Sequence, residues 1–381
     1  MKIDKSKLSK ALKQIGIFVG KGSINQNASL VHFRNENNKA VLFATDFASA
    51  GRATFETEEQ GLFEFCIEYA QLLQSTKIRS KEIDAELFEN RECENGVKCN
   101  GIQFSDDKTK FVWATRGADD LAEIEAKTVV PNCNFVEIDA KTLKYALKEA
   151  GYARNEKNNQ TPYIMGVNFS CENKDISLVS TDKCRIAAWE EIERPENGFD
   201  GRPDESVSGI FSPKTIQSVM LFDDEDHIKV YIDDTQIALI SENFEAYATK
   251  IQSDYPNISS FFQKEIISSY EVSVADVKES LGIIVDSNVK SLKLSFTEDK
   301  VHFVANLQTG ESMEDEIVCI RKSGKDETIS FDPNYFGQIF SNVDSDKMTI
   351  EFRNMGGKFN IVSYRGDDGA YGMLAPQKNA N

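Results

Sequence analysis

The sequence repeats itself at intervals of about one third of its length. Each repeat opens with a short apolar strand and an amphipathic helix, at Ile3-Asp4, at Ile138-Asp139 and at Val272-Ser273. The first two openings are 135 residues apart, and the dipeptides Thr45-Asp46 and Thr181-Asp182 are 136 apart. Because two separate landmarks keep nearly the same offset, we infer three like units and a pseudo-symmetric architecture.

Each unit divides again into two strand–helix–strands modules. A second strand and helix begin near Phe63, Ile210 and Ile329. The last two of these helices open with Ser-Pro and Asp-Pro, which are helix N-cap signals. Alternating apolar residues after each helix predict antiparallel strands. The sequence therefore predicts an α+β fold of three pseudo-repeated domains, each built from two modules.

Two joins of mixed composition separate the units, around residues 118–132 and 253–268. We expect domains at residues 1–122, 131–254 and 264–381. Each of these has a size at which a domain supports its own core.

The composition excludes several classes of protein. No apolar stretch approaches the roughly 18 residues of a membrane helix, and the Lys-rich start lacks the apolar run of a signal peptide. The seven cysteines contain no C-x-x-C pair, a pattern typical of reduced thiols. We expect a cytoplasmic protein with no membrane association, no cofactor and no metal.

The net charge of −18 argues against nucleic acid when it is taken globally, because phosphate binding needs lysine and arginine. The charge is nevertheless segregated. Residues 1–22 hold six lysines against one acid, and residues 139–157 hold five basic residues against three acids. Basic charge is therefore concentrated on particular helices.

The position of these lysines on their helices repeats as well. Apolar residues at i, i+3, i+4 and i+7 predict the buried stripes, which are Leu8, Ala11, Leu12 and Ile15, and then Leu143, Ala146, Leu147 and Ala150. The lysines of the opposite faces are Lys7, Lys10 and Lys13, and then Lys141, Lys144 and Lys148. A solvated face has the same pattern, so the residues alone leave both interpretations open.

Residues for catalysis are absent from the sequence pattern. There is no phosphate-binding loop, no G-x-G-x-x-G after a strand and no nucleophile elbow. His32 and His302 fall inside strand patterns, where structural histidines are expected, and the paired acids lie in turns. We expect that the protein is not an enzyme.

Five local motifs, in order, resemble the bacterial DNA polymerase III beta subunit, the sliding clamp family. Leu42–Asp46 is similar to the family's A-T-D strand end, and Phe111–Thr115 to a strand closing its first domain. Ser180–Ala187 is similar to its A-T-D-G-H-R-L-A run, Ser253–Pro256 to its P-D-Y-R turn, and Tyr371–Pro376 to its apolar tail. The resemblance covers essentially the whole chain and identifies it as a divergent member.

This resemblance implies a ring-shaped homodimer that encircles duplex DNA without sequence preference, with helices lining the hole and antiparallel sheets outside. Its localisation would be cytoplasmic and nucleoid-associated. The implied DNA-binding residues are Lys7, Lys10, Lys13, Lys21, Lys77, Arg79, Lys141, Lys144, Lys148, Arg154 and Lys214. The implied dimer interface brings Phe111 and Trp113 against Ile284 and Val285. Ordinary core packing is the alternative for Trp113.

The resemblance also implies a pocket that binds short apolar peptides of the DNA polymerase catalytic subunit, the clamp loader and other clamp-binding-motif proteins. Carried over, the pocket comprises Ile164, Thr181, Lys183, Arg185, Ile186, Ser253, Asn257, Ile258, Met373, Leu374, Ala375 and Pro376. Lys183-Cys184 replaces Gly-His, Ser253 replaces a proline and Asn257 an arginine, so the peptide preference should differ. The alternative function is a diverged clamp-fold interaction scaffold that does not encircle DNA.

Overall fold

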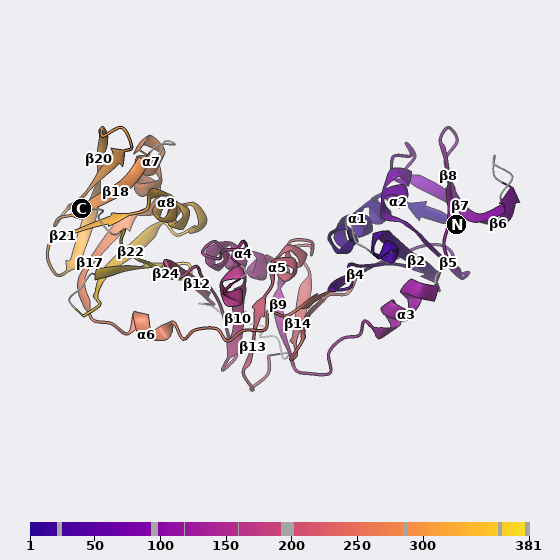
Figure 1. The fold of residues 1–381 in the computed structure, drawn as a ribbon, viewed down its shortest axis with the longest axis horizontal. Coiled ribbons are helices and arrows are strands. Elements are labelled where there is room, and N and C mark those ends of the chain that lie inside the picture. The colour runs from indigo at the N-terminus through magenta and orange to yellow at the C-terminus, as the bar shows by residue number, and fades with distance from the viewer. Residues whose placement is uncertain are drawn as a thin grey trace. The chain divides into compact units, whose positions relative to one another are not determined.

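The chain forms two compact units in this computed structural model, which describes residues 1–20, 25–92, 98–117, 119–158, 160–191, 202–284, 289–356 and 360–377. Unit 1 comprises Met1–Lys141 and Ser212–Lys250. Unit 2 comprises Thr142–Phe211 and Ile251–Asn381. Figure 1 labels the helices and strands of both.

Unit 1 contains an eight-stranded antiparallel sheet in the order β5-β2-β3-β4-β16-β15-β14-β9, and a four-stranded sheet in the order β1-β6-β7-β8. The strands are β1 Lys2–Asp4, β2 Leu30–Glu36, β3 Lys39–Thr45, β4 Ser49–Glu56, β5 Phe63–Glu68, β6 Glu82–Glu92, β7 Lys98–Ser105, β8 Lys110–Ala114, β9 Phe135–Asp139, β14 His227–Ile232, β15 Gln236–Ile240 and β16 Phe244–Thr249. Its helices are α1 Lys5–Ile15, α2 Tyr69–Ser75, α3 Asp119–Lys127 and α5 Pro213–Val219, with short 3₁₀ turns at Gly16–Phe18 and Gln26–Ser29.

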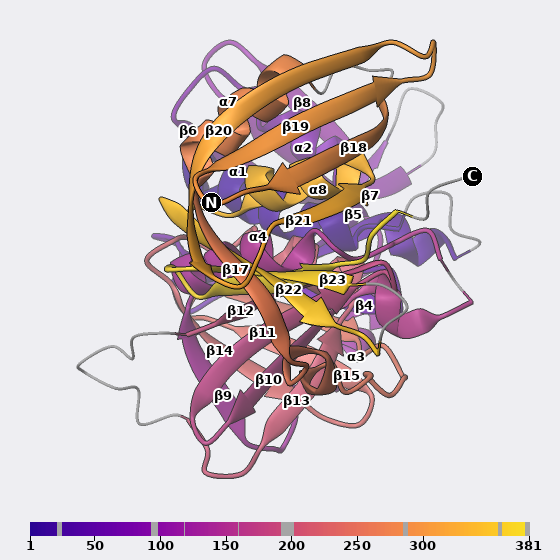
Figure 2. The ribbon, with the colours of Figure 1, turned by 90° about the vertical axis from the view of Figure 1, so that its left-hand side faces the viewer.

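Unit 2 contains one twelve-stranded antiparallel sheet in the order β13-β10-β11-β12-β24-β23-β22-β17-β20-β19-β18-β21. Figure 2 shows β20, β19, β18 and β21 running side by side. The strands are β10 Val167–Glu172, β11 Asp175–Thr181, β12 Arg185–Glu190, β13 Val207–Phe211, β17 Ile266–Ser273, β18 Val289–Phe296, β19 Lys300–Leu307, β20 Ser312–Ser323, β21 Glu327–Phe331, β22 Lys347–Asn354, β23 Asn360–Gly366 and β24 Ala370–Leu374. The helices are α4 Ala140–Gly151, which begins two residues before the unit, α6 Ser259–Phe262, α7 Val274–Ile284 and α8 Pro333–Asn342, with a 3₁₀ turn at Pro162–Met165.

The six predicted strand–helix openings are confirmed, and so is the α+β class. Each opening is a strand that leads directly into a helix, from β1 into α1 to β21 into α8. Asp4, Ser212 and Asp332 cap their helices with side-chain oxygens that accept backbone N–H donors. Both predicted apolar stripes are buried, because they face the sheets.

The repeated Thr-Asp dipeptides form the same turn in both places. The Thr45 hydroxyl donates to the Ser49 carbonyl at 2.7 Å, and Asp46 Oδ1 accepts from the Ser49 N–H at 2.7 Å. In the other repeat Thr181 donates to the Arg185 carbonyl at 2.6 Å, and Asp182 Oδ1 accepts from the Arg185 N–H at 3.0 Å. The Thr-Asp pair therefore recurs because both of its side chains close the turn.

The strand after each turn is joined sideways to a later strand in an equivalent register. In unit 1, β4 pairs with β16 and Ala53 lies opposite Phe244. In unit 2, β12 pairs with β24 and Trp189 lies opposite Ala370. We call these two pairings the strand joints. Ala53 and Trp189 differ by the 136 residues that also separate Thr45 from Thr181, so the two joints are equivalent.

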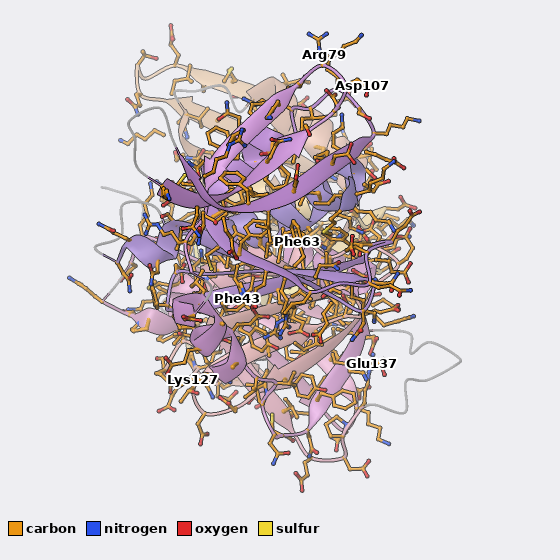
Figure 3. All side chains as sticks on the ribbon, turned by 90° about the vertical axis from the view of Figure 1, so that its right-hand side faces the viewer. Phe43, Phe63, Arg79, Asp107, Lys127 and Glu137 are labelled. Atoms are coloured by element: carbon orange, nitrogen blue, oxygen red, sulfur yellow. The ribbon has the colours of Figure 1, made fainter. Side chains whose placement is uncertain are left out.

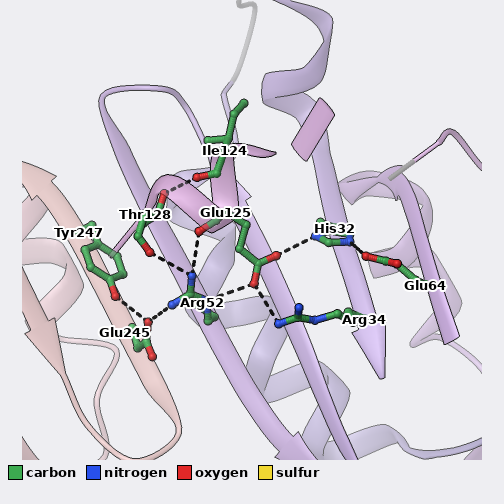
Figure 4. Close-up of polar contacts among 9 residues, drawn as sticks. All are labelled: His32, Arg34, Arg52, Glu64, Ile124, Glu125, Thr128, Glu245 and Tyr247. Carbon is green, nitrogen blue, oxygen red and sulfur yellow. Dashed lines mark hydrogen bonds and ion pairs between the residues drawn. The ribbon is translucent and has the colours of Figure 1, made fainter. Parts of the chain in front are cut away.

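The sequence did not predict helix α3, which lies within the first join. Its Glu125 is buried and contacts His32 Nδ1 at 2.7 Å and Arg52 Nε at 3.2 Å, while His32 Nε2 lies 2.8 Å from Glu64 (Figure 4). Arg52 also donates to the carbonyl of Thr128 at 3.2 Å. These contacts fasten α3 to the face of the sheet opposite to α1. Gly51 lies against Phe18 on the α1 side, and the side chain of the next residue on the strand, Arg52, points to the other face.

Candidate nucleic-acid interface and peptide pocket

The predicted cations of unit 1 divide into those that face solvent and those that contact other groups of the unit. Lys13 of α1 is exposed on the face opposite to the buried stripe, whereas Lys7, although exposed, donates to the Glu56 carbonyl of β4 at 3.4 Å. Lys10 forms an ion pair with Asp223, just after α5. Lys214 of α5 donates to the Ile17 carbonyl at 2.6 Å and lies 3.3 Å from Asp46, so it fastens elements of the unit.

The cations on and after α4 divide in the same way. Lys141 is exposed, and Lys144 is partly buried. Lys148 forms an ion pair with Asp344, just after α8. Arg154 donates to the Gly151 carbonyl at 2.6 Å and pairs with Glu156, so it closes the end of α4. Lys10 thus connects α1 to the segment after α5 in unit 1, and Lys148 connects α4 to the segment after α8 in unit 2.

The remaining predicted cations lie away from these helix faces. Lys77 and Arg79 are exposed in the turn after α2, and Figure 3 labels Arg79 near Asp107. Lys21 lies outside the described residues.

A buried acid lies beside Lys148. The Glu149 carboxyl is 1% exposed, and its two oxygens have no hydrogen-bond partner among the described residues. Burial and the nearby Asp368 carboxylate raise the pKa of Glu149 to about 8. The Tyr145 hydroxyl donates a hydrogen bond of 2.8 Å to Asp368 Oδ2. With its raised pKa, Glu149 keeps its proton at neutral pH, beside the exposed Lys148.

A cavity of about 230 Å³ lies at the second strand joint of unit 2, where the sequence predicts the peptide pocket. The predicted residues that line it are Thr181, Lys183, Arg185, Ile186, Ile258, Met373 and Ala375. The sequence missed Tyr163, Cys184, Pro256, Phe261 and Ile361, which also line it. Tyr163, Cys184 and Pro256 flank predicted residues by one position, and Ile361 lies on β23, beside β24. Phe261 lies in helix α6, three residues after the predicted Ile258.

Arg185 forms a fixed wall of this pocket. Its guanidinium carbon lies 4.4 Å from the centre of the Tyr335 ring, and its Nε lies 3.0 Å from Asp182 Oδ2. Lys183 has a φ of 77° and donates to the Thr161 hydroxyl at 2.9 Å. Glycine would adopt that φ without strain, which explains why the family pattern has glycine at this position.

Other predicted pocket residues lie elsewhere. Ile164 and Leu374 are each 1% exposed, because they point into the core. Leu374 follows Met373 on a strand, so the two side chains face opposite sides of the sheet. Asn257 lines an adjoining cavity of about 620 Å³, and neither Ser253 nor Pro376 lines either cavity.

The described residues that are predicted for the dimer interface lie on the edge strand β8 and at the end of helix α7. Phe111 and Trp113 lie on β8, the edge of the four-stranded sheet, with ring centres 5.9 Å apart. Trp113 Nε1 donates to the Ser75 hydroxyl of α2 at 3.0 Å, so both rings face the helix side. The expectation for Ile284 is wrong, because its side chain is wholly buried, whereas Ile283 is 61% exposed. Val285 lies outside the described residues.

The family models decide the relationship of this chain to known proteins. The central domain of the DNA polymerase III beta subunit matches residues 137–257, and the C-terminal domain of the same subunit matches residues 263–376. Together they cover more than half of the sequence. The chain belongs to the DNA polymerase III beta-subunit family.

The curated relatives are distant members of this family. A protein named beta sliding clamp from Streptococcus pneumoniae is 22% identical over 249 residues, and one from Mycoplasma genitalium is 21% identical over 255 residues. The matches cover 63% and 64% of this chain, and the chain spans 63% and 66% of the length of these relatives.

Solved beta-subunit structures share the clamp fold of this chain. The beta subunit of Streptococcus pyogenes superimposes with a TM-score of 0.85 at 15% identity, over 99% of each chain. That of Thermotoga maritima gives 0.82 at 18% identity, over 100% of this chain and 99% of its own. The predicted fold is therefore confirmed over the first domain too, which the family models leave unmatched.

Among the helices that the structure describes, none combines the length and apolar character needed to cross a membrane.

Proposed function

We propose that two copies of this chain join edge to edge into a ring that slides on duplex DNA and tethers the replicative polymerase. In this proposal the protein is a non-enzymatic processivity factor. Its three domains are residues 1–122, 131–254 and 264–381, and a separate loader opens the ring. The observation that carries the proposal is a third strand joint that each chain leaves incomplete.

The repeat identifies the two halves of that third joint. β4 and β12 are each the third strand after the helix of a first module, and β20 holds this position in the third repeat. β16 and β24 are each the last strand of a second module, and β8 holds this position in the first repeat. Within the described residues, β8 pairs only with β7 along Lys110–Ala114, and Ser312–Glu316 of β20 pairs only with β19.

Transferring the register of the two joints predicts which residues meet. The pair Asn306–Ser312 on β19 and β20 corresponds to the pair Thr45–Ala50 on β3 and β4. Lys110 directly follows the turn that the Asp106 N–H closes on the Thr109 carbonyl. Glu245 likewise follows the turn that the Ser241 N–H closes on the Phe244 carbonyl. Lys110 of one copy then lies opposite Glu314 of the other, and Phe111 opposite Met313. Opposite charges thus meet at the position where Arg52 pairs with Glu245 in unit 1. Two such contacts, related by two-fold symmetry, close a ring without open edges.

The exposed lysines support a DNA-facing role for the helices. Lys13 and Lys141 sit on helix faces turned away from their sheets, and Lys7 is exposed at the flank of α1, where it reaches the Glu56 carbonyl, in a chain of net charge −18. Contacts from lysines to phosphates carry no sequence information, which is what a sliding protein needs. Lys10 and Lys148 instead contribute mainly through their aspartate pairs.

The pocket of unit 2 supports the tethering role. It is a concave site with apolar walls from Ile186, Ile361 and Met373, and it suits a short apolar peptide of a polymerase, loader or repair protein. The alternative is a clamp-fold scaffold that uses this pocket without encircling DNA.

Charge reversal separates the two functions. Replacing Lys7, Lys13 and Lys141 by glutamate should abolish processive primer extension by the cognate polymerase and loader, while the dimer and peptide binding persist. The matched control replaces the exposed sheet-side lysines Lys39, Lys81 and Lys293 by glutamate, which makes the same change in net charge. Equal processivity of the two triple variants would refute the DNA-facing role and favour the scaffold.

A further inference from the structure

A second cavity lies at the first strand joint, in the position that the peptide pocket occupies at the second joint. It has a volume of about 340 Å³ and is formed by the Thr45–Ala50 turn, by β16 and by helix α3. The peptide pocket is formed by the Thr181–Ile186 turn, by β24 and by the segment around α6. The repeat has therefore produced the same hollow twice, once in each unit.

The residues of the turn and of the joint strand correspond through the strand registers. Thr45 corresponds to Thr181, Phe47 to Lys183, and Tyr247 to Met373. Phe47 has a φ of 70°, close to the 77° of Lys183, so the two turns present these side chains alike. Phe47 is 46% exposed, which leaves an aromatic ring open to a partner at the mouth of the cavity.

Each hollow has an exposed lysine in its lining, Lys127 in unit 1 and Lys183 in unit 2, and the charges differ in the cavities that adjoin them. Lys127 of α3 lines the unit 1 cavity with its side chain 73% exposed (Figure 3), and its pair with Glu123 is equally exposed. Such exposed pairs contribute about 0.5 kcal/mol, so a ligand carboxylate replaces Glu123 at little cost.

The adjoining cavity on the other side of α3 adds Arg34 and Arg52 to Lys127, together with the carboxylates of Glu64 and Glu125. It measures about 460 Å³, shares Thr128 and Tyr247 with the first, and carries Arg34, whose side chain is 42% exposed (Figure 4). Arg34 lies 3.7 Å from Glu125, which already accepts from His32 and Arg52. In unit 2 the adjoining cavity carries Glu172, Asp175, Glu190 and Glu191 instead.

We propose that the unit 1 cavity is a second docking site, which binds a short acidic peptide with an apolar or aromatic anchor. The anchor packs against Phe47, Ala50 and Ile124, and the acidic residues of the peptide meet Lys127 and Arg34. The four acidic residues of the cavity that adjoins the unit 2 pocket disfavour such a peptide there in spite of Lys183, so the two sites select different partners. This proposal does not depend on DNA binding or on ring closure.

The test measures fluorescence anisotropy of two labelled hexapeptides on the full chain. Each has a central Leu-Phe pair, flanked by two glutamates on each side in one peptide and by two lysines on each side in the other. Ala48→Trp fills the unit 1 cavity, and Cys184→Trp makes the same change at the corresponding exposed position of unit 2. We expect Ala48→Trp to weaken the acidic peptide by about tenfold, equivalent to about 1.4 kcal/mol, and Cys184→Trp to leave it unchanged.

A second measurement does not depend on either tryptophan variant folding. Hydrogen exchange of the unaltered chain with the acidic peptide should slow at residues 45–50 and 124–128, and Lys127→Glu should remove that protection. Protection confined to residues 181–186 and 256–261, or no binding of the acidic peptide, would overturn the proposal.

Discussion

Arg52 of β4 lies directly opposite Glu245 of β16, and the two side chains form an ion pair across the first strand joint. The same arginine holds Glu125 of α3, so a single guanidinium fastens both the joint and the helix that follows it. The equivalent position at the open edges carries the reversed charges, Glu314 on β20 and Lys110 on β8. In the proposed ring, Lys110 of one copy and Glu314 of the other would form the same kind of ion pair between chains.

Lys110→Glu or Glu314→Lys should each convert the dimer to monomers, because like charges then face each other at both contacts of the ring. The double variant restores opposite charges and should restore the dimer. Sedimentation equilibrium gives the masses, and Lys108→Glu in the adjacent turn is the control that should stay dimeric. A double variant no more dimeric than the single ones would contradict the predicted register.

Glu149→Gln should stabilise the protein at alkaline pH. The raised pKa of about 8 means that the folded chain keeps a proton on Glu149 that the unfolded chain releases near its ordinary value of 4.5. Stability therefore falls as the pH rises between these values, by at most about 1.4 kcal/mol per pH unit, and the variant lacks this loss. Urea unfolding should show no difference near pH 4.5 and a more stable variant above about pH 8.

The exposed Glu156 supplies the control for this prediction, since Glu156→Gln changes the same chemical group on the surface. The stability difference between Glu149→Gln and the unaltered chain could instead stay constant with pH. That result would mean that folding leaves the pKa of Glu149 unchanged, and it would contradict the prediction.

His32→Gln should destabilise unit 1 in a pH-dependent way. Burial alone would lower the pKa of His32, but Glu125 and Glu64 outweigh it and raise the pKa above its ordinary value of 6.5. The stabilisation from the charged ring is therefore complete below about pH 6.5 and is lost as the pH rises through the raised value. The loss of unfolding free energy on His32→Gln should be about 1–3 kcal/mol at low pH and should shrink with rising pH. Urea unfolding at several pH values checks this, and a constant loss would contradict it.

The architecture was predictable because each repeat combines helical and strand periodicities of its apolar residues. Three of the openings also place a capping residue, Asp4, Ser212 or Asp332, before an apolar stripe. Helix α3 was not predictable, because its stripe is only Leu121 and Ile124 among charged residues, and its partner Arg52 is distant in sequence. The candidate sites were predictable in part for a similar reason. Sequence places Lys10 and Lys148 on a polar face, but the aspartates that engage them lie on other elements. Leu374 was misplaced because strand alternation sends neighbouring side chains to opposite faces.

Whether the protein encircles DNA is tested most directly by comparing its retention on circular DNA and on the same DNA after it has been linearised. The chain is loaded onto a nicked circular duplex by its cognate loader, separated from free protein by gel filtration, and the circle is then cut once. A ring predicts that the protein stays on the circle through the column at high salt and leaves within minutes of linearisation. Equal retention on circular and linear DNA would contradict the account.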